Sequence, residues 1–326
     1  MQMATDNSEN SVERTQECNR SLEEYFVRTA TLEHLDFLFS LQKTLSAPIR
    51  GAADVFCANL VAVYVTASAV PVFARQMAYQ AGYLMMLGVT TGAHAVLSDH
   101  LSPEARRERI QQSLQKDVTT SPWKERLQET VDRLTDESLA RFLEAQPAKD
   151  SASHILRQCV ALTWSAFEVL ASDLFTSVVN GNPKLCSSLL RDERTKKLYQ
   201  LKELGLMLEE YDYDPSHHMG DVLLQQCRMD DINAIRTVYD VLFTDRDTLR
   251  SALNDARLWR LYKIRNLIVH RAAVVDELFL RGTGLNADLG SRLRVTPREL
   301  EDFILLVAQV GKELLSAASA IPEWRK

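Results

Sequence analysis

The chain has 326 residues, a length that fits one large domain or two of ordinary size. Hydrophobic residues make up 46% and charged residues 25%, which is the balance of a soluble globular protein with a sizeable core. The net charge of -6 excludes a general nucleic-acid coating protein, so any contact with RNA or DNA has to come from a local basic patch.

The cysteines and glycines predict neither a metal nor a cofactor. Five scattered cysteines form no Cys-x-x-Cys pair, which indicates reduced thiols in a cytoplasmic protein and not a disulfide framework or a zinc site. The glycines form no phosphate-cradling loop, which argues against an ATPase or a dinucleotide enzyme. The polar N-terminus carries no secretory signal.

The first half of the chain begins with a polar, acidic segment, 1–20, that we expect to be a disordered tail. Residues 21–150 are predicted to form a helical N-terminal region, whose role the sequence does not indicate. This region is apolar and rich in alanine to about residue 100, with breaks expected near Ser46-Ala47-Pro48 and at Pro71.

The run 55–74 contains no charged residue and is long enough to span a bilayer. Polar residues and Pro71 inside the run, and the lack of a lysine and arginine excess beside it, argue against a span. A buried core helix is the interpretation we favour, with membrane association through 55–74 as the alternative.

Ser102-Pro103-Glu104 is typical of a helix start, with serine as the N-cap and proline at the first helical position. A polar helical stretch is predicted from there to about residue 146. The segment 146–151 is the best candidate for a linker between the two halves.

The second half, 151–320, shows clearer helical periodicity. One apolar stripe runs from Leu156 to Val178 and ends at Asn180-Gly181. Further helices are expected over about 185–211, 231–243 and from Thr244-Asp245 onward, with loops at 211–221 and 282–293. Thr296-Pro297-Arg298-Glu299 predicts a capping box before a last amphipathic helix that ends near residue 318. No strand-like alternation is present, so we predict an all-α fold, an up-and-down helical bundle preceded by a second helical region.

The most informative motif is Arg265-Asn266-Leu267-Ile268-Val269-His270, which falls inside a predicted helix. Arginine offers a fixed fork of donors to a phosphate, and histidine exchanges protons near neutral pH. Asn266 can orient either group. At about 100° per residue, Asn266 and His270 share one side of this helix, whereas Arg265 borders the apolar arc about 140° from His270.

An arginine that borders the core needs a partner, because an unpaired buried charge is costly. The facing helix, 151–180, offers Glu168 and Asp173. Five basic residues between 257 and 271, with no acid among them, also suggest a polyanion surface, for which Arg260, Lys263 and Arg271 are the candidate phosphate-binding residues. A solvated helix face is the simpler interpretation of such a charge run.

These groups suit metal-independent cleavage of RNA. A neutral His270 takes the proton of a ribose 2′-hydroxyl, the oxygen attacks the adjacent phosphate, and Arg265 stabilises the added negative charge. Only RNA carries this hydroxyl. The alternative interpretation is structural: an Asn266–His270 hydrogen bond and an Arg–Glu bridge that fasten two helices.

The segment 257–277, with Arg265, Asn266 and His270 at the spacing of the Arg-x4-6-His signature, resembles the HEPN superfamily of small helical domains from prokaryotic defence and toxin systems. The segments 159–175, with Glu168 at the polar position, and 282–315 resemble the family's first helix and its last loop and helix. The resemblance covers roughly residues 151–318.

The resemblance implies a helical bundle that dimerises and pairs two motifs into one composite site. It also implies metal-independent endoribonuclease activity on an RNA substrate, in a toxin or anti-phage setting in which an antitoxin or another defence protein is a possible partner. The alternative is a non-enzymatic module of the same type that binds RNA, nucleotide or a partner protein. Residues 1–150 match no family that we recognise.

Overall fold

The computed structural model describes residues 21–27, 32–199 and 209–321. In these ranges the named elements are all helices and no strand is present, so the predicted all-α class is confirmed. The predicted tail, 1–20, lies outside the described residues. The chain divides into two compact units, 1–29 with 67–154 and 30–66 with 155–326.

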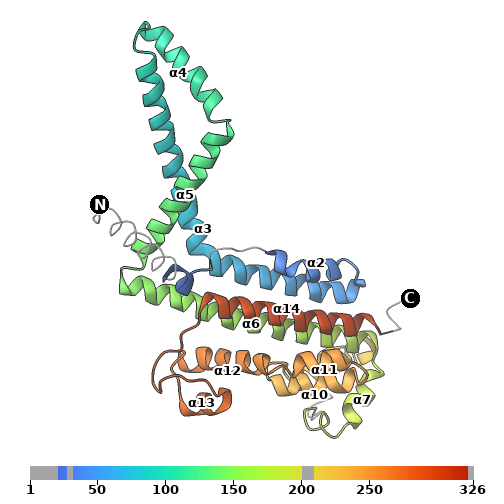
Figure 1. The fold of residues 1–326 in the computed structure, drawn as a ribbon. Coiled ribbons are helices and arrows are strands. Elements are labelled where there is room, and N and C mark those ends of the chain that lie inside the picture. The colour runs from blue at the N-terminus through green and yellow to red at the C-terminus, as the bar shows by residue number, and fades with distance from the viewer. Residues whose placement is uncertain (1–20, 28–31, 200–208, 322–326) are drawn as a thin grey trace. The chain divides into compact units, whose positions relative to one another are not determined.

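Unit 1 is a helical hairpin with two small apolar cores (Figure 1). It contains α4 (Pro103–Asp117), α5 (Ser121–Phe142), the second part of α3 (Ala47–Leu97) and the start of α6 (Gln146–Gly181). Ser102 caps α4 by accepting a hydrogen bond from the Ala105 amide at 3.4 Å, as the sequence predicts. The start of α4 is therefore fixed by its capping residue, whereas α5 begins after Thr120 without a side-chain cap.

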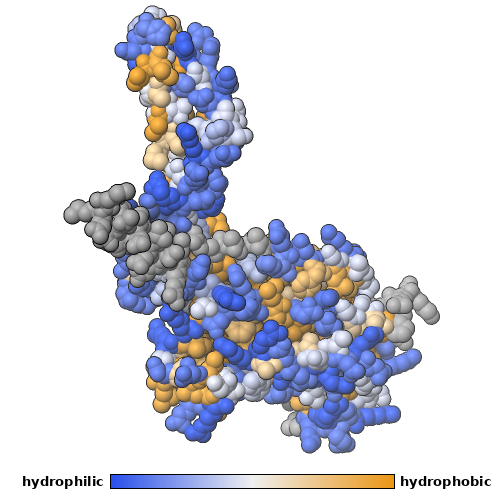
Figure 2. All heavy atoms as spheres, in the orientation of Figure 1, coloured by the Kyte–Doolittle hydropathy of each residue, from blue (hydrophilic) through white to orange (hydrophobic). Residues whose placement is uncertain are grey.

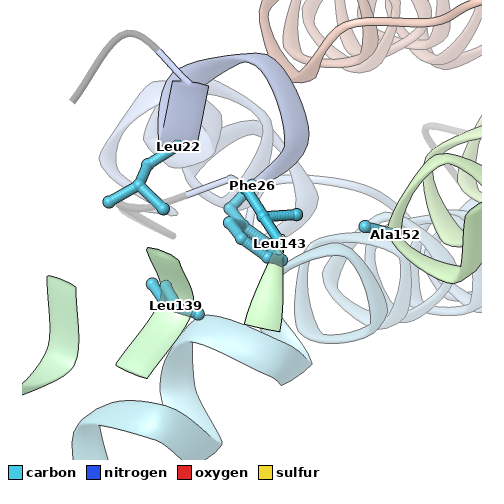
Figure 3. Close-up of a cluster of buried hydrophobic side chains, with 5 residues drawn as sticks. All are labelled: Leu22, Phe26, Leu139, Leu143 and Ala152. Carbon is cyan, nitrogen blue, oxygen red and sulfur yellow. The ribbon is translucent and has the colours of Figure 1, made fainter. Parts of the chain in front are cut away.

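The two cores of unit 1 hold the hairpin together from opposite parts of α5. One core joins the N-terminal segment to the end of α5 and the start of α6, and Figure 3 shows Phe26 beside Leu143 within it. Its buried members are Leu22, Phe26, Leu139, Leu143 and Ala152. The other core, nearer the start of α5, consists of Ala78, Trp123, Leu127 and Val131.

Unit 2 is a helical bundle built around α6 and α14 (Pro297–Ser319), which Figure 1 shows lying side by side. The first part of α3 covers one side of this pair, where Phe56 lies against Gly311, and α12 (Ala256–Arg271) lies on the other, where Tyr262 contacts Trp164 at 5.1 Å between ring centroids. The remaining helices are η1 (Leu32–Leu35), α2 (Asp36–Gln42), α7 (Leu185–Arg191), η2 (Pro215–His217), α9 (Met219–Gln226), α10 (Ile232–Leu242), α11 (Asp247–Leu253) and α13 (Glu277–Thr283).

Several boundary predictions are wrong. The helix expected over about 185–211 ends at Arg191, and turns follow it to residue 198. Helix α3 begins at Ala47 but continues through Pro71 without a break, because a proline removes only one helical hydrogen bond and long apolar runs on both sides favour continuation. The expected linker 146–151 is the first turn and a half of α6, where Pro147 occupies a position that needs no amide donor. The expected loop 211–221 contains η2 and the start of α9.

The apolar run 55–74 is divided between the two units. Phe56, Leu60 and Val63 are buried, and Val63 accepts a weak hydrogen bond from the Cys159 thiol of α6, so this part of the run is core. By length and composition, both α3 and α6 are apolar enough to cross a membrane, a test that core helices also pass, and about half of each apolar window is buried (44% and 56%).

Candidate functional site

Helix α12 presents the Arg-Asn-x-x-x-His motif, and its boundaries follow from local chemistry. Asp255 caps its start by accepting a hydrogen bond from the Arg257 amide at 2.7 Å. A buried stripe then fixes the rotation of the helix in unit 2, formed by Leu258, Leu261, Ile264, Leu267 and Ile268. This rotation decides where each motif side chain points.

Arg265 is turned toward α6 and is largely buried. One terminal nitrogen of its guanidinium lies 3.2 and 3.3 Å from the two carboxylate oxygens of Glu168, and the other donates to Asn266 Oδ1 at 2.9 Å. The side chains of Arg265 and Glu168 are 20% and 14% exposed. The expected partnership between the motif arginine and the facing helix is therefore present, through Glu168 and not through Asp173.

Removal from water disfavours the ionised form of Glu168, even though this carboxylate is paired with Arg265. Burial raises the pKa of Glu168, and the neighbouring charge of Arg265 opposes this effect without cancelling it. The guanidinium is thus bound by a carboxylate that gains little from being ionised there. A stronger anion, such as a phosphate, could compete for the same donors.

His270 lies at the other end of the motif and is exposed, next to Val269, which is 55% exposed. No hydrogen bond or ion pair of His270 is present among the described residues, and Asn266, the expected partner, bonds to Arg265 instead. Since Arg265 faces α6, the two groups of one chain do not address the same point in space. The separation that the helical wheel predicts is retained in the folded bundle.

The backbone just beyond His270 is strained. Ala272 and Ala273 adopt left-handed conformations, with φ of 50° and 64°, which residues with a side chain rarely adopt. The loop after α13 stabilises this turn, because Leu293 donates its amide to the Ala273 carbonyl at 2.8 Å and Val275 donates to Ser291 at 2.9 Å. The end of α12 that carries His270 is therefore fixed by contacts and not by its own preference.

The basic residues of α12 are matched by acids from neighbouring segments. Arg257 pairs with Asp255, Arg260 with Glu299 of α14 at 2.7 Å, and Arg271 with Asp276 at 3.4 Å. Lys263 lies 4.5 Å from the ring centroid of Trp259. The sequence run without acids does not become an unbalanced positive surface, because the fold supplies carboxylates from elsewhere.

One cavity borders α6 beside Glu168, and another borders α12. A cleft of about 740 Å³ beside Glu168 is lined by further acids, Asp173, Asp221 and Asp230, and by one basic residue, Arg228, so the excess of acids disfavours a phosphate there. Burial raises the pKa of Asp173. A smaller cavity of about 340 Å³ lies between α12, α14 and the loop 285–295, and Arg260 contributes to its wall.

Comparison with known protein families, curated proteins and solved structures finds no match to this chain.

His218 and the buried cysteines lie outside the motif. His218 stacks on Tyr211 at 4.4 Å between ring centroids and lies 3.6 Å from Asp221, and both of these partners line the acidic cleft. Within the described residues, no group of three or more histidine, cysteine or acidic side chains is placed to hold a metal ion. Burial raises the pKa of Cys57, Cys159 and Cys186 to about 11, as expected of thiols in a core.

The acidic cleft is the feature that the sequence did not reveal. Its walls come from α6 and, much later in the chain, from Tyr211, α9 and the segment 228–230 that closely follows α9. In the sequence, Asp221 and Asp230 lie in polar segments that predict loops. Only the packing of α9 against α6, where Gly220 donates its amide to Asn180 Oδ1 at 2.6 Å, brings them beside Glu168.

Proposed function

We propose that the protein is a metal-independent endoribonuclease that acts as a homodimer, in a toxin or anti-phage defence setting. The single observation that carries the proposal is the division of the motif: Arg265 is bound and oriented by Asn266 and Glu168, whereas His270 stands exposed and without a partner among the described residues. The oriented guanidinium of Arg265 can bind an anion, and the imidazole of His270 can exchange a proton. The resemblance of 257–277 to the HEPN signature supports the same conclusion.

The reaction that suits these groups is transfer within the RNA backbone. His270 Nε2 or Nδ1 accepts the proton of the 2′-hydroxyl, the 2′-oxygen forms a bond to phosphorus, and the bond from phosphorus to the 5′-oxygen breaks. The leaving oxygen takes up a proton from a second acid or from water. Arg265 stabilises the charge on the phosphoryl oxygens, in exchange for its bond to Glu168. The products are a 2′,3′-cyclic phosphate and a 5′-hydroxyl end.

A homodimer supplies the geometry that one chain lacks. Arg265 and His270 of one copy point in different directions, so an Arg265 from one copy and a His270 from the other are the natural pair for one phosphate. The exposed apolar side chain of Val269 beside His270 supports a contact surface at this position. The acidic cleft beside Glu168 disfavours approach of RNA through that cleft.

A second candidate function is a non-enzymatic module that binds RNA, nucleotide or a partner protein such as an antitoxin. The pairing of Arg257, Arg260 and Arg271 with neighbouring acids favours this candidate, because it leaves little free positive charge for a polyanion. Either function is compatible with a cytoplasmic location or with membrane association through 55–74.

Expression in cells separates the two candidates. We expect the wild-type chain to slow growth and fragment total RNA, and His270→Ala to abolish both effects. His100→Ala, which removes another exposed histidine outside the motif, is the matched control and should behave as wild type. The purified protein should leave 2′,3′-cyclic phosphate ends and retain its activity in EDTA. Intact RNA under every inducing condition, or dependence on a divalent metal, contradicts the proposal.

A further inference from the structure

The cavity of about 340 Å³ between α12, α14 and the loop 285–295 has walls of two kinds. Three arginines, Arg260, Arg292 and Arg294, supply positive charge, so we call it the arginine cavity. In Figure 2, the edge of unit 2 where Figure 1 shows the loop between α13 and α14 carries both blue hydrophilic and orange hydrophobic residues. The apolar part of the cavity wall consists of Ile264, Leu285, Ala287, Leu293, Val295 and Phe303.

Arg260 is held in place by the start of α14 and yet uses few of its donors. Its Nη2 donates to Glu299 Oε1 at 2.7 Å, and Glu299 Oε2 accepts from the Thr296 amide at 3.1 Å. A guanidinium carries five N–H donors. Among the described residues no other hydrogen bond of this side chain is present, and its Nε is buried without an acceptor. The fold therefore fixes a guanidinium in the cavity wall and leaves most of its donors unused.

A purely structural arginine of this kind is costly. Buried donors without acceptors are rare, because each loses its hydrogen bonds to water and gains none in return. A phosphate group binds arginine through two parallel N–H···O bonds, so it can occupy Nε together with a terminal nitrogen. The side chain of Arg260 is 37% exposed and has room to turn toward such a ligand. A bound oxyanion would thus supply the acceptor that the protein does not.

The charges around the arginine cavity favour one small anion. Its three arginines face two acids, Asp288 and Glu299, which leaves a net charge of +1, and Glu299 is already engaged by Arg260 and by the cap of α14. The positive end of the α14 dipole adds to this potential, because residues on both sides of the N-cap line the cavity. A polyanion needs a larger excess of positive charge than this.

We propose that the arginine cavity binds a small phosphate monoester that carries an apolar or aromatic group. A monoester has about two negative charges near neutral pH, whereas a phosphate inside an RNA strand has one and is flanked by others. The apolar wall, which includes the buried side chains of Leu293 and Phe303, receives the rest of the ligand. The proposal does not depend on ribonuclease activity.

The loop 285–295 provides a readout at the site itself. Its Leu293 donates the backbone amide to the Ala273 carbonyl at 2.8 Å, so the loop is already fastened to the segment after α12. A ligand held between this loop and Arg260 adds a second connection. Amides of the loop should therefore exchange with solvent more slowly when the cavity is occupied.

Calorimetric titration of the full chain with phenyl phosphate tests the proposal. We expect binding, slower amide exchange in the loop 285–295, and weaker affinity for glucose 6-phosphate, which lacks the apolar group. Arg292→Gln should weaken the binding of phenyl phosphate about ten-fold or more, as expected when a charged hydrogen-bond partner is removed. Arg292 is exposed, and its side chain forms no hydrogen bond or ion pair among the described residues, so this variant should keep the wild-type fold. Arg298→Gln, at an exposed position of α14 outside the cavity, removes the same charge and should leave the affinity unchanged.

Two further variants test the chemistry of the wall. Asp288→Asn removes an acid and should raise the affinity about two- to five-fold, the usual size of a partly screened charge interaction. Arg260→Lys keeps the charge but removes the fork of donors, and should weaken binding.

Three results overturn the proposal. The first is the absence of any binding of phenyl phosphate by the wild-type chain. The second is equal weakening by Arg292→Gln and Arg298→Gln, which would indicate diffuse attraction to the surface and not a site. The third is binding of a 5′-phosphorylated DNA oligonucleotide but not of phenyl phosphate, which would assign the cavity to nucleic acid.

Discussion

In unit 2, burial raises the pKa of two carboxyl groups of α6, those of Glu168 and Asp173. Glu168 is 14% exposed and is held there by Arg265, yet burial still raises its pKa. An ion pair of this kind adds little net stability, and its retention makes sense where the arginine has to be kept oriented. Asn266 supports this role, since it fixes the other side of the same guanidinium.

Burial also disfavours the ionised form of Asp173, for which no hydrogen bond or ion pair is present among the described residues, and this leads to a pH-dependent prediction. Burial raises the pKa of its carboxyl above the ordinary value, so the folded state binds the proton more tightly than the unfolded state. Its contribution to stability is present below the unfolded pKa of about 4 and is lost as the pH rises through the folded value. At neutral pH the ionised carboxylate is therefore destabilising.

We expect Asp173→Asn to raise the free energy of unfolding at pH 7, because the neutral amide avoids this cost. The advantage over wild type should shrink toward zero as the pH falls below about 4. Urea unfolding followed by circular dichroism across this pH range measures the difference. Asp245→Asn, at an exposed position, removes the same charge and serves as the control. A variant less stable than wild type at pH 7 contradicts the prediction.

At the scale of elements, the packing of α14 against α3 and α6 depends on one glycine. A Cβ at Gly311 would overlap the ring of Phe56 and would meet Leu170 Cδ2 at 3.0 Å. Both neighbours are fully buried, so neither can move aside freely. Gly311 thus sets how closely the three helices at the centre of unit 2 approach each other.

We expect Gly311→Ala to lower the free energy of unfolding by about 1–3 kcal/mol, the usual cost of overpacking a core. Gly51→Ala provides the matched comparison, because it makes the same change in a helix of the same unit at a position with no atom within 4 Å. Its better helix propensity should raise the free energy of unfolding by up to about 1 kcal/mol. Opposite signs in urea unfolding support the packing argument, and a stabilising Gly311→Ala refutes it.

The sequence predicted those elements whose signals are local. The capping box of Thr296 and Glu299 is present at the start of α14, and the stripe that includes Leu261 and Ile264 is buried as the periodicity of α12 requires. Boundaries that depend on tertiary contacts were less predictable. Helix α3 continues through Pro71, and the segment 30–66 clusters with the C-terminal unit and not with the N-terminal one, because Phe56 and Leu60 find their partners there.

The candidate site shows the same division between local and tertiary information. The helical wheel placed Arg265 toward α6 and away from His270, and both positions follow from 3.6 residues per turn. The choice of Glu168 over Asp173 as the partner depends on how α6 and α12 cross, which the sequence does not encode locally. The acids opposite Arg260 and Arg271 come from α14 and from the segment before α13, so charge balance could not be predicted from α12 alone.

At the scale of the whole molecule, the function proposed above requires an assembly, because Arg265 and His270 of one chain are separated. In a two-fold dimer each composite site takes its arginine from one copy and its histidine from the other. A dimer of Arg265→Ala with His270→Ala then contains one site that lacks both groups and one site that is intact. A site formed within one chain would leave no intact site in any mixture of the two variants.

Mixing equal amounts of the Arg265→Ala and His270→Ala chains should therefore restore activity that neither variant has alone. Random pairing makes about half of the dimers mixed, and each mixed dimer has one of two sites intact, so we expect about a quarter of the wild-type rate. Cleavage of a fluorescent RNA after co-refolding measures it. Mixing His270→Ala with the double variant Arg265→Ala/His270→Ala is the control, because no pairing of these chains contains His270. If the first mixture is as inactive as this control, both groups act within one chain.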